Sequence, residues 1–284
     1  MQGVKLEIPE VTVRRLAAEQ SDTMAAKSLG IAVSSFFLLR KRYGIPSFTR
    51  STGCRRSLRD GKLLKPGEGI AHPWHSDLYV GCFERIDSPA KAYFLGLLAA
   101  DGHTSLKPNA KFVSIELQQP DDAVLNELSA LLRLNRGAQS LLREGKKPSG
   151  RLLIHSRELT ESLIRGGITE NTETHSLRVH VPPDLRSHCV RGLLDGDGHI
   201  SARKKSLYLC GCSESIAATV TQWADEQLGI QAACKWRSLP SGKRFFTLTF
   251  GGRPRDVLKW AYAPGGPRVP RKEVQADLWL SMCE

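Results

Sequence analysis

Two acidic residues of this chain occupy matching places in a repeated segment. Residues 94–102 read FLGLLAADG and residues 190–198 read VRGLLDGDG, so Asp101 matches Asp197 at a shift of 96 residues. This shift indicates two similar half-domains, each of which supplies one carboxylate at the same structural position. Two carboxylates related by an approximate twofold axis form a site for divalent cations, which can assist the hydrolysis of phosphodiesters.

Each of these acids stands at the end of a predicted helix. Ser88 is the expected N-cap of the first helix, Pro89 fits its first turn and Gly102 ends it. Small residues four apart allow two helix backbones to approach closely. We therefore expect the two helices to pack side by side, with their terminal carboxylates close together at one edge of the interface. The small interface residues are Gly96 and Ala100 on the first helix and Gly192 and Gly196 on the second.

Two carboxylates in such proximity repel each other unless a cation lies between them. Mg²⁺, a hard ion that binds carboxylates, water and substrate oxygens, is the expected cofactor, with Mn²⁺ as a substitute. Asp195 has no acidic counterpart, because Ala99 stands at that position in the first repeat. We therefore interpret Asp195 as a structural residue. His103 and His199, which follow the two Asp–Gly pairs, are interpreted as the first polar residues of strands.

Both segments resemble the LAGLIDADG motif, and over residues 83–280 the chain resembles a two-repeat LAGLIDADG homing endonuclease. The similarity includes the longer stretches FERIDSPAKAYFLGLLAADG and HCVRGLLDGDGHIS. The resemblance implies an α+β fold, in which a pseudo-twofold pair of αββαββα half-domains forms a saddle-shaped antiparallel sheet over the DNA major groove. It also implies a monomer, because both motifs lie on one chain.

The resemblance further implies metal-assisted hydrolysis of one phosphodiester in each DNA strand. Asp101 and Asp197 are the implied metal ligands. Arg157 and Arg253 precede the third helix of each half, where the family often has Lys, and are assigned to the phosphate and the attacking water. Gln118, at the end of the second strand, is assigned to orienting a water.

DNA contact is implied for side chains of the sheets that alternate with core-facing ones. Arginine and lysine can bind guanine edges or phosphates, and the sequence does not distinguish the two roles. Lys272, near the C-terminus, is assigned to contact with the DNA backbone. The candidates on or near the strands are Lys107, Lys111, Arg143, Arg151, Arg203, Lys205, Lys235, Arg237 and Arg244.

The N-terminal region resembles a bacterial helix-turn-helix. Its third helix would enter a major groove and present Arg40, Lys41 and Arg42. Nine basic residues and one acid lie between Arg40 and Lys65, which favours a basic linker that follows DNA. The predicted organisation is a helix-turn-helix at residues 1–46, a linker at 47–82, and repeats at 83–180 and 181–284.

Composition supports a nucleic-acid partner. The 284 residues carry a net charge of +12, which favours an anionic partner, most simply double-stranded DNA. No run of ~18 apolar residues and no N-terminal signal segment is present, so we expect no membrane span and a cytoplasmic protein of bacterial or phage origin. The seven cysteines are odd in number and form no Cys-x-x-Cys pair, which favours reduced thiols.

Three other functions are to be compared with this one. Certain sporulation regulators resemble a catalytically silent LAGLIDADG domain joined to a helix-turn-helix, although there the helix-turn-helix follows the domain and here it precedes it. An RNA maturase that binds intron RNA is equally compatible with a basic saddle. An intein fits poorly, because the ends at Met1 and Glu284 lack the terminal nucleophile and the His–Asn pair that splicing requires.

Overall fold

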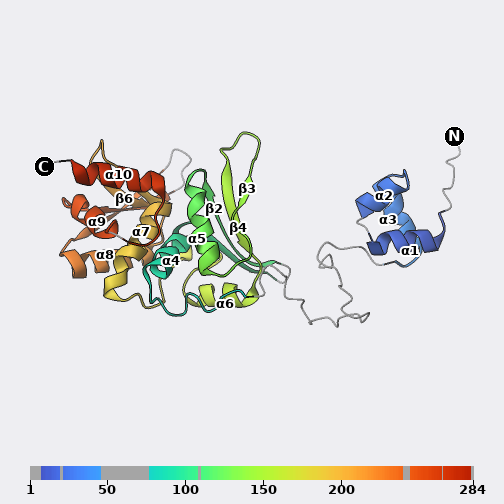
Figure 1. Ribbon diagram of the computed structural model, residues 1–284, viewed down its shortest axis with the longest axis horizontal. Coiled ribbons are helices and arrows are strands. Elements are labelled where there is room, and N and C mark those ends of the chain that lie inside the picture. The colour runs from blue at the N-terminus through green and yellow to red at the C-terminus, as the bar shows by residue number, and fades with distance from the viewer. Residues whose placement is uncertain are drawn as a thin grey trace. The chain divides into compact units, whose positions relative to one another are not determined.

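The computed structural model describes residues 8–19, 22–45, 77–107, 110–238, 244–263 and 265–282. The chain divides into two compact units, Met1–Ile70 and Ala71–Glu284. The described part of the first unit is helical, and the second unit is a larger mixture of helices and strands (Figure 1). The three helices are α1 (Glu10–Glu19), α2 (Asp22–Ser28) and α3 (Val33–Arg42).

The N-terminal unit has its own small core, in which Val13, Ala25 and Phe36 are fully buried. Arg40 lies one helical turn after Phe36 and therefore shares its inward face. Its guanidinium donates to the Asp22 carboxylate at 3.1 Å and to a backbone carbonyl at 2.9 Å, and only 4% of the residue is exposed. The prediction that Arg40 is presented to DNA is therefore wrong, whereas Lys41 and Arg42 are exposed.

The second unit contains two halves with the same order of elements. The first half comprises α4 (Pro89–Asp101), β1 (Gly102–Lys107), β2 (Ala110–Gln118), α5 (Val124–Leu131), β3 (Gln139–Leu141), β4 (Ser149–Ile154) and α6 (Arg157–Arg165). The second comprises α7 (Arg186–Asp197), β5 (Gly198–Ser201), β6 (Ser206–Cys210), α8 (Glu214–Leu228), β7 (Ala232–Ser238), β8 (Arg244–Phe250) and α9 (Pro254–Ala261), and is followed by α10 (Pro270–Ser281). Short 3₁₀ turns lie at Asp121–Ala123, Thr172–Thr174 and Pro183–Leu185.

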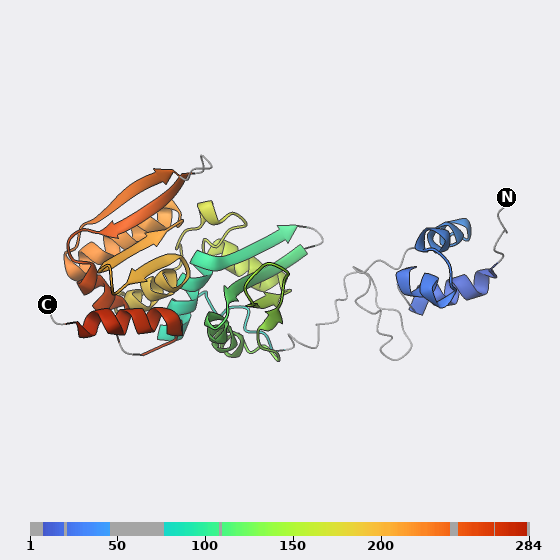
Figure 2. The same cartoon turned by 90° about the horizontal axis from the view of Figure 1, so that it is seen from above.

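Each half folds into one four-stranded antiparallel sheet. The strand orders are β1-β2-β4-β3 and β5-β6-β8-β7, so the two sheets have identical topology, and Figure 2 shows them as two separate groups of strands. Gly102 pairs with Ile115 in the first half as Gly198 pairs with Leu209 in the second. The predicted fold, a pair of αββαββα half-domains preceded by a small all-helical unit, is confirmed.

One face of each sheet is covered by helices and the other is open. In β2, Val113, Ile115 and Leu117 are buried on the covered face, and the alternate residues belong to the open face. Lys111 pairs with Leu106 and shares the covered face. The pKa of Glu161 on α6 is lowered mainly by its hydrogen bond from Arg157, and the charge of Lys111 adds to this effect. The register therefore contradicts the prediction that Lys111 faces DNA.

Helices α4 and α7 pack against each other between the two sheets (Figure 1). Gly96 lies against the backbone carbonyl of Cys189, and Gly192 lies against that of Tyr93, so closely that a Cβ at either glycine would overlap the opposing oxygen. A side chain at either position would separate the helices. These two glycines therefore set the distance between the halves.

The second unit begins before the predicted end of the linker. Cys82 is fully buried, and the Tyr79 amide donates to the Leu132 carbonyl at 3.1 Å. The Lys91 ammonium lies 5.2 Å from the centre of the Tyr79 ring. Residues 77–82 thus belong to the folded unit, and the predicted linker boundary at residue 82 is too late; residues 47–76 lie outside the described part.

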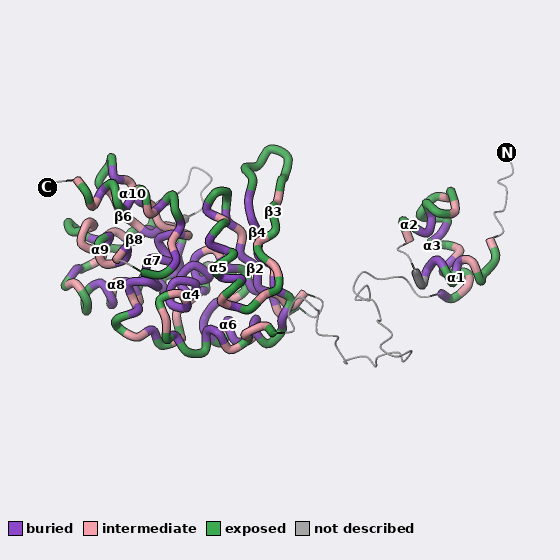
Figure 3. The backbone as a smooth tube through the Cα atoms, in the orientation of Figure 1, coloured by how far each residue is buried: buried purple, intermediate pink, exposed green. Residues whose placement is uncertain are grey.

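The core is continuous through the helix pair and both sheets, as the purple segments of Figure 3 show. Among the described cysteines, Cys82, Cys189 and Cys212 are buried. Among the described helices, none is long and apolar enough by itself to span a membrane; α2 and α3 reach that length and composition only together, with a bend of 103°.

Candidate metal centre and nucleic-acid interface

The repeated acids occupy the ends of the paired helices. Asp101 is the last residue of α4 and Asp197 is the last residue of α7. Gly102 and Gly198 follow them, and the amides of these glycines donate to the carbonyls of the preceding helical turns. A Cβ built on Gly196 would lie 2.8 Å from the Asp101 carboxylate, so this carboxylate extends from α4 across the glycine of α7.

The electrostatics of the two carboxylates reflect their proximity. Burial raises the pKa of Asp101 to about 6. Burial, followed by the negative charge of Asp101, raises the pKa of Asp197 to about 8. The nearby Lys272 ammonium acts in the opposite direction on both groups. In the absence of a further cation, two ionised carboxylates are therefore unfavourable at this interface.

The donor set of the pair fits a hard divalent cation. Both groups offer carboxylate oxygens, which Mg²⁺ and Ca²⁺ prefer. Within the part of the chain that the structure describes, no cluster of three or more His, Cys, Asp or Glu side chains could hold a metal ion. A cation held by Asp101 and Asp197 alone would need further oxygen ligands, such as water, to complete its coordination.

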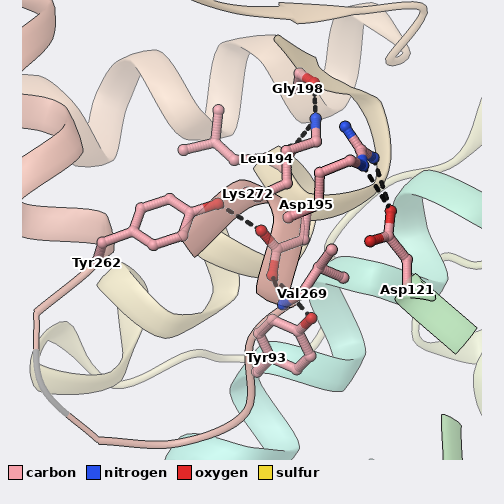
Figure 4. Close-up of polar contacts among 9 residues, drawn as sticks. Tyr93, Asp121, Leu194, Asp195, Gly198, Tyr262, Val269 and Lys272 are labelled. Carbon is pink, nitrogen blue, oxygen red and sulfur yellow. Dashed lines mark hydrogen bonds and ion pairs between the residues drawn. The ribbon is translucent and has the colours of Figure 1, made fainter. Parts of the chain in front are cut away.

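Lys272 lies beneath this pair and not on the protein surface. It is 5% exposed, and its ammonium donates to the carbonyls of Leu194, at 3.2 Å, and Gly198. Figure 4 shows the side chain directed from α10 toward the junction of α7 and β5. The prediction that Lys272 contacts the DNA backbone is therefore wrong, because the helix interface and not the solvent surrounds the ammonium.

Asp195 is the centre of a separate buried network. Its carboxylate accepts hydrogen bonds from the hydroxyls of Tyr93, at 2.8 Å, and Tyr262, and from the Val269 amide at 2.8 Å (Figure 4). These partners come from α4, from the end of α9 and from the segment before α10. Asp195 thus joins elements of both halves, in agreement with its interpretation as a structural residue.

The assigned accessory residues occupy equivalent places in the two halves. Arg157 begins α6 and pairs with Glu161 at 2.6 Å, whereas Arg253 precedes α9 and pairs with Asp256 at 2.6 Å. Both arginine side chains are exposed, and they are separated by the same 96 residues as the two aspartates. Their carboxylate partners are half-exposed, so a phosphate could compete for either guanidinium.

Gln118 and its counterpart differ between the halves. Gln118 is exposed at the end of β2, three residues after Ile115. Leu209 of β6 matches Ile115, because each pairs with the glycine after a repeated aspartate, and the residue three positions after Leu209 is Cys212. Cys212 is buried, and burial together with the Asp197 charge raises the pKa of its thiol to about 12. The second half therefore has no exposed amide at this position.

Several predicted DNA contacts lie on exposed or open surfaces. Arg151 pairs in register with Glu116 on the open face, and the same Glu116 receives two hydrogen bonds from Arg143, both at 2.8 Å. Lys235 pairs with Thr247 on the open face of the second sheet. Arg203 and Lys205 are exposed in the turn between β5 and β6, and Lys107 ends β1 on the open face. Arg237 and Arg244 lie in β7 and β8, but their side chains are outside the described part.

Ring contacts on the open faces were not predicted from the sequence. His199 stacks on Tyr208 with ring centres 4.5 Å apart. In the first half, His103 and His155 flank Phe112 at 5.6 and 6.1 Å. His103 and His199 each stand two residues after a repeated aspartate. The alternation of side chains along the strands is the sequence signal that could have predicted Phe112 and Tyr208 on the open face. They add apolar surface beside the carboxylates.

Comparison with known proteins found one family model and several solved structures that resemble this chain. A family model described as a LAGLIDADG-like domain matches residues 88–165. In fold, the chain is similar to I-DmoI in complex with DNA and Ca (15% identity, 69% of this chain and 97% of that one, TM-score 0.48) and to the homing endonuclease I-WcaI bound to its DNA recognition sequence (11%, 75% and 94%, 0.47). It is also similar to full-length DUF199/WhiA from Thermatoga maritima (15%, 72% and 66%, 0.41). A search of curated proteins found no match.

Proposed function

We propose that this chain, which contains a LAGLIDADG-like domain at residues 88–165, is a site-specific DNA endonuclease. It hydrolyses one phosphodiester in each strand of a long target and makes a double-strand break, as a homing endonuclease that acts as a monomer. The observation that carries the proposal is the pair of Asp101 and Asp197 at the ends of two packed helices, where burial, and then the charge of Asp101, raises the pKa of Asp197.

The substrate class follows from charge and shape. The chain carries a net charge of +12, and Arg151, Lys235 and Lys107 lie on the open faces of two sheets with the same topology. Basic side chains on a pair of related sheets suit a duplex, whose two strands are themselves related by an approximate twofold axis. The two carboxylates lie at the interface between the sheets and so would meet one strand each.

Each residue of the proposed site has its own role in the reaction. Asp101 and Asp197 would hold Mg²⁺, which supplies Lewis-acid stabilisation and a more acidic water for attack on phosphorus. Gln118, exposed at the end of β2, would orient a water through its side-chain amide. Arg157 and Arg253 each exchange a carboxylate partner for a DNA phosphate, which holds the scissile bond in place.

The decisive experiment uses DNA that spans the gene's own insertion locus with the insertion removed. The wild-type protein, Asp101→Asn and Asp197→Asn are each incubated with this DNA in Mg²⁺ and in Ca²⁺. Asp277→Asn is a matched control, because Asp277 is an exposed carboxylate on α10. We expect a discrete double-strand break by the wild type and by the control in Mg²⁺, and loss of cleavage or nicking alone in the two other variants.

Other outcomes would replace the proposal. Tight binding of the DNA without any cut would indicate a catalytically silent regulator. Tight binding of intron RNA under the same conditions, again without a cut, would indicate a maturase. Cleavage that survives both Asp101→Asn and Asp197→Asn would show that the helix-end carboxylates are not the catalytic pair.

A further inference from the structure

A charged pair lies on the open face of the first sheet. Arg143 follows β3 in the hairpin that leads to β4 (Figure 1). Two nitrogens of its guanidinium, Nη1 and Nη2, donate to the two carboxylate oxygens of Glu116 on β2, both at 2.8 Å. The Ser149 hydroxyl of β4 donates to the same carboxylate at 2.8 Å. The carboxylate is therefore fixed by its own sheet and in turn fixes the guanidinium.

The pair is oriented but still accessible. The side chains of Arg143 and Glu116 are 43% and 32% exposed. The hydrogen bonds from Arg143 hold the pKa of Glu116 below its usual range, and the charge of Arg151 in the neighbouring strand acts in the same direction. The carboxylate is thus ionised at neutral pH, and the orientation of the guanidinium is set before any ligand binds.

One edge of the guanidinium remains open to a ligand. Glu116 occupies the end formed by Nη1 and Nη2, and within the part of the chain that the structure describes the Arg143 side chain donates to no other residue. The side edge, which contains Nε, can donate two parallel hydrogen bonds to O6 and N7 of guanine in a major groove. The Glu116 carboxylate repels a phosphate but not the uncharged edge of a base. The pair therefore favours a base as the acceptor.

The second half differs at this position. By strand register Leu209 matches Ile115, so the residue that matches Glu116 is Cys210. A thiol does not offer the two anionic oxygens that hold a guanidinium end-on. The pair thus belongs to one half and not to the repeated fold, as expected of a group that recognises one half of an asymmetric target.

We propose that Arg143 recognises a guanine in the half-site bound by the first half, and that Glu116 is the positioning residue that directs the open guanidinium edge to O6 and N7 of this base. The inference rests on the proposed function, because it requires that the open face of the sheet lies against the DNA target. It assigns Arg143 to a base and not to a phosphate.

The test measures DNA binding by fluorescence anisotropy, with Ca²⁺ in place of Mg²⁺ and with DNA that spans the insertion locus. Each guanine is replaced in turn by 7-deazaguanine, which lacks the N7 acceptor but still pairs with cytosine. Inosine at the same place is the matched control, because it lacks only the amino group of the minor groove. For the wild type we expect a position in one half-site at which 7-deazaguanine weakens binding roughly tenfold and inosine does not.

The protein variants connect this loss to the pair. Arg143→Ala should abolish the loss at that one position, and Arg143→Lys, which keeps the charge without the planar fork, should abolish most of it. Glu116→Gln should reduce the loss while it strengthens binding to DNA of unrelated sequence, because an anion is removed from the interface. Lys146→Gln is the matched control, since Lys146 is an exposed cation of the same hairpin. It should weaken binding to every DNA and leave the loss at that position unchanged.

Four results would overturn the inference, with thermal unfolding as the control for folding. If Arg143→Ala weakens binding to every DNA alike and lowers the salt slope by about 1, the arginine contacts a phosphate. If Glu116→Gln leaves the loss at full size, Glu116 does not position Arg143. If Lys146→Gln abolishes the loss, the hairpin as a whole and not the pair is responsible. If Arg143→Ala does not fold, a full loss in Arg143→Lys has the same force.

Failure of the proposed function gives a different result. A wild-type protein that binds the insertion-locus DNA no better than unrelated DNA, and does not cut it in Mg²⁺, would refute the endonuclease and this inference together. A wild-type protein that cuts the target without any guanine whose effect depends on Arg143 would refute this inference alone.

Discussion

At the scale of single residues, Asp101 and Asp197 share a motif position but not an environment. Burial raises the pKa of both carboxylates, and the charge of Asp101 adds to this effect at Asp197. Lys272 and Cys212 both lie beside the junction of α7 and β5. The sequence repeat therefore does not imply that the two halves bind metal or cleave DNA equally well.

The raised pKa of Asp197 predicts a pH-dependent stability of the metal-free protein. The folded protein binds a proton at about pH 8, whereas an unfolded aspartate binds it near its ordinary value of 3.8. Stability is therefore full at low pH and falls as pH rises between these values. From pH 6 to pH 8 we expect a loss of about 2 kcal/mol, which Asp197→Asn removes. Urea unfolding at both pH values measures it, and an unchanged pH slope in the variant would contradict it.

Gln118 predicts unequal cleavage of the two DNA strands. Only the first half has an exposed amide at the end of its second strand, since the second half has the buried Cys212 there. Gln118→Ala should slow the cut of one strand by roughly 100-fold and leave the other less affected, as expected when a water loses its orientation. Strand-specific end labels on the target follow each cut.

Gln119→Ala is the control for this strand effect. Gln119 is the neighbouring amide, and its side chain donates to Asp122 and Ser140 at 3.4 Å within the first half. Gln119→Ala should leave the cleavage rates of both DNA strands at their wild-type values. Equal slowing of the two strands by Gln118→Ala would refute a role confined to one half.

At the scale of elements, the contact between α4 and α7 determines where the carboxylates lie. Gly192→Ala should lower the free energy of unfolding by about 3 kcal/mol, because the added methyl overlaps the Tyr93 carbonyl and would lie 2.7 Å from the Leu97 amide nitrogen. Both obstacles are backbone atoms and cannot rotate away. Urea denaturation gives the change in stability, and the same sample assayed for cleavage should show a larger loss than its folded fraction explains.

Gly81→Ala provides the comparison for the helix interface. A methyl at Gly81 would meet the end of the Glu84 side chain at 3.3 Å, which can move aside. Its unfolding free energy should remain within about 0.5 kcal/mol of wild type. If Gly81→Ala and Gly192→Ala destabilise equally, close helix packing is not the cause.

Local sequence signals determine where helices and strands form better than they determine which distant residues the side chains contact. The helix Pro89–Asp101 begins after Ser88 and ends before Gly102 as predicted, because an N-cap, a first-turn proline and a terminal glycine are local signals. The environments of Arg40 and Lys272 were mispredicted. Each is a basic residue whose burial depends on acceptors far away in sequence, in Asp22 and Leu194, and no local pattern identifies such acceptors.

At the scale of the whole molecule, the basic chain folds into two units, each with its own hydrophobic core. The N-terminal unit carries exposed Lys41 and Arg42 at the end of α3, together with exposed Phe37 and Leu38 on the same helix. A helix that presents both cations and apolar side chains suits a DNA groove, where apolar groups can contact thymine methyls. We therefore propose that this unit binds DNA beside the cleavage site.

Removal of residues 1–76 tests this role and retains Leu78, Tyr79 and Cys82, which pack with the core of the second unit. The shortened protein should still cut DNA in Mg²⁺ but bind the long target more weakly. If Lys41 and Arg42 contact phosphates, the slope of log affinity against log salt should fall by about 2, because each contact releases roughly one counterion. Fluorescence anisotropy between 50 and 200 mM salt, roughly the range over which such contacts matter, measures the slope. The double variant Lys41→Gln, Arg42→Gln should reproduce it in the full chain, and an unchanged slope in both proteins would remove the N-terminal unit from DNA binding.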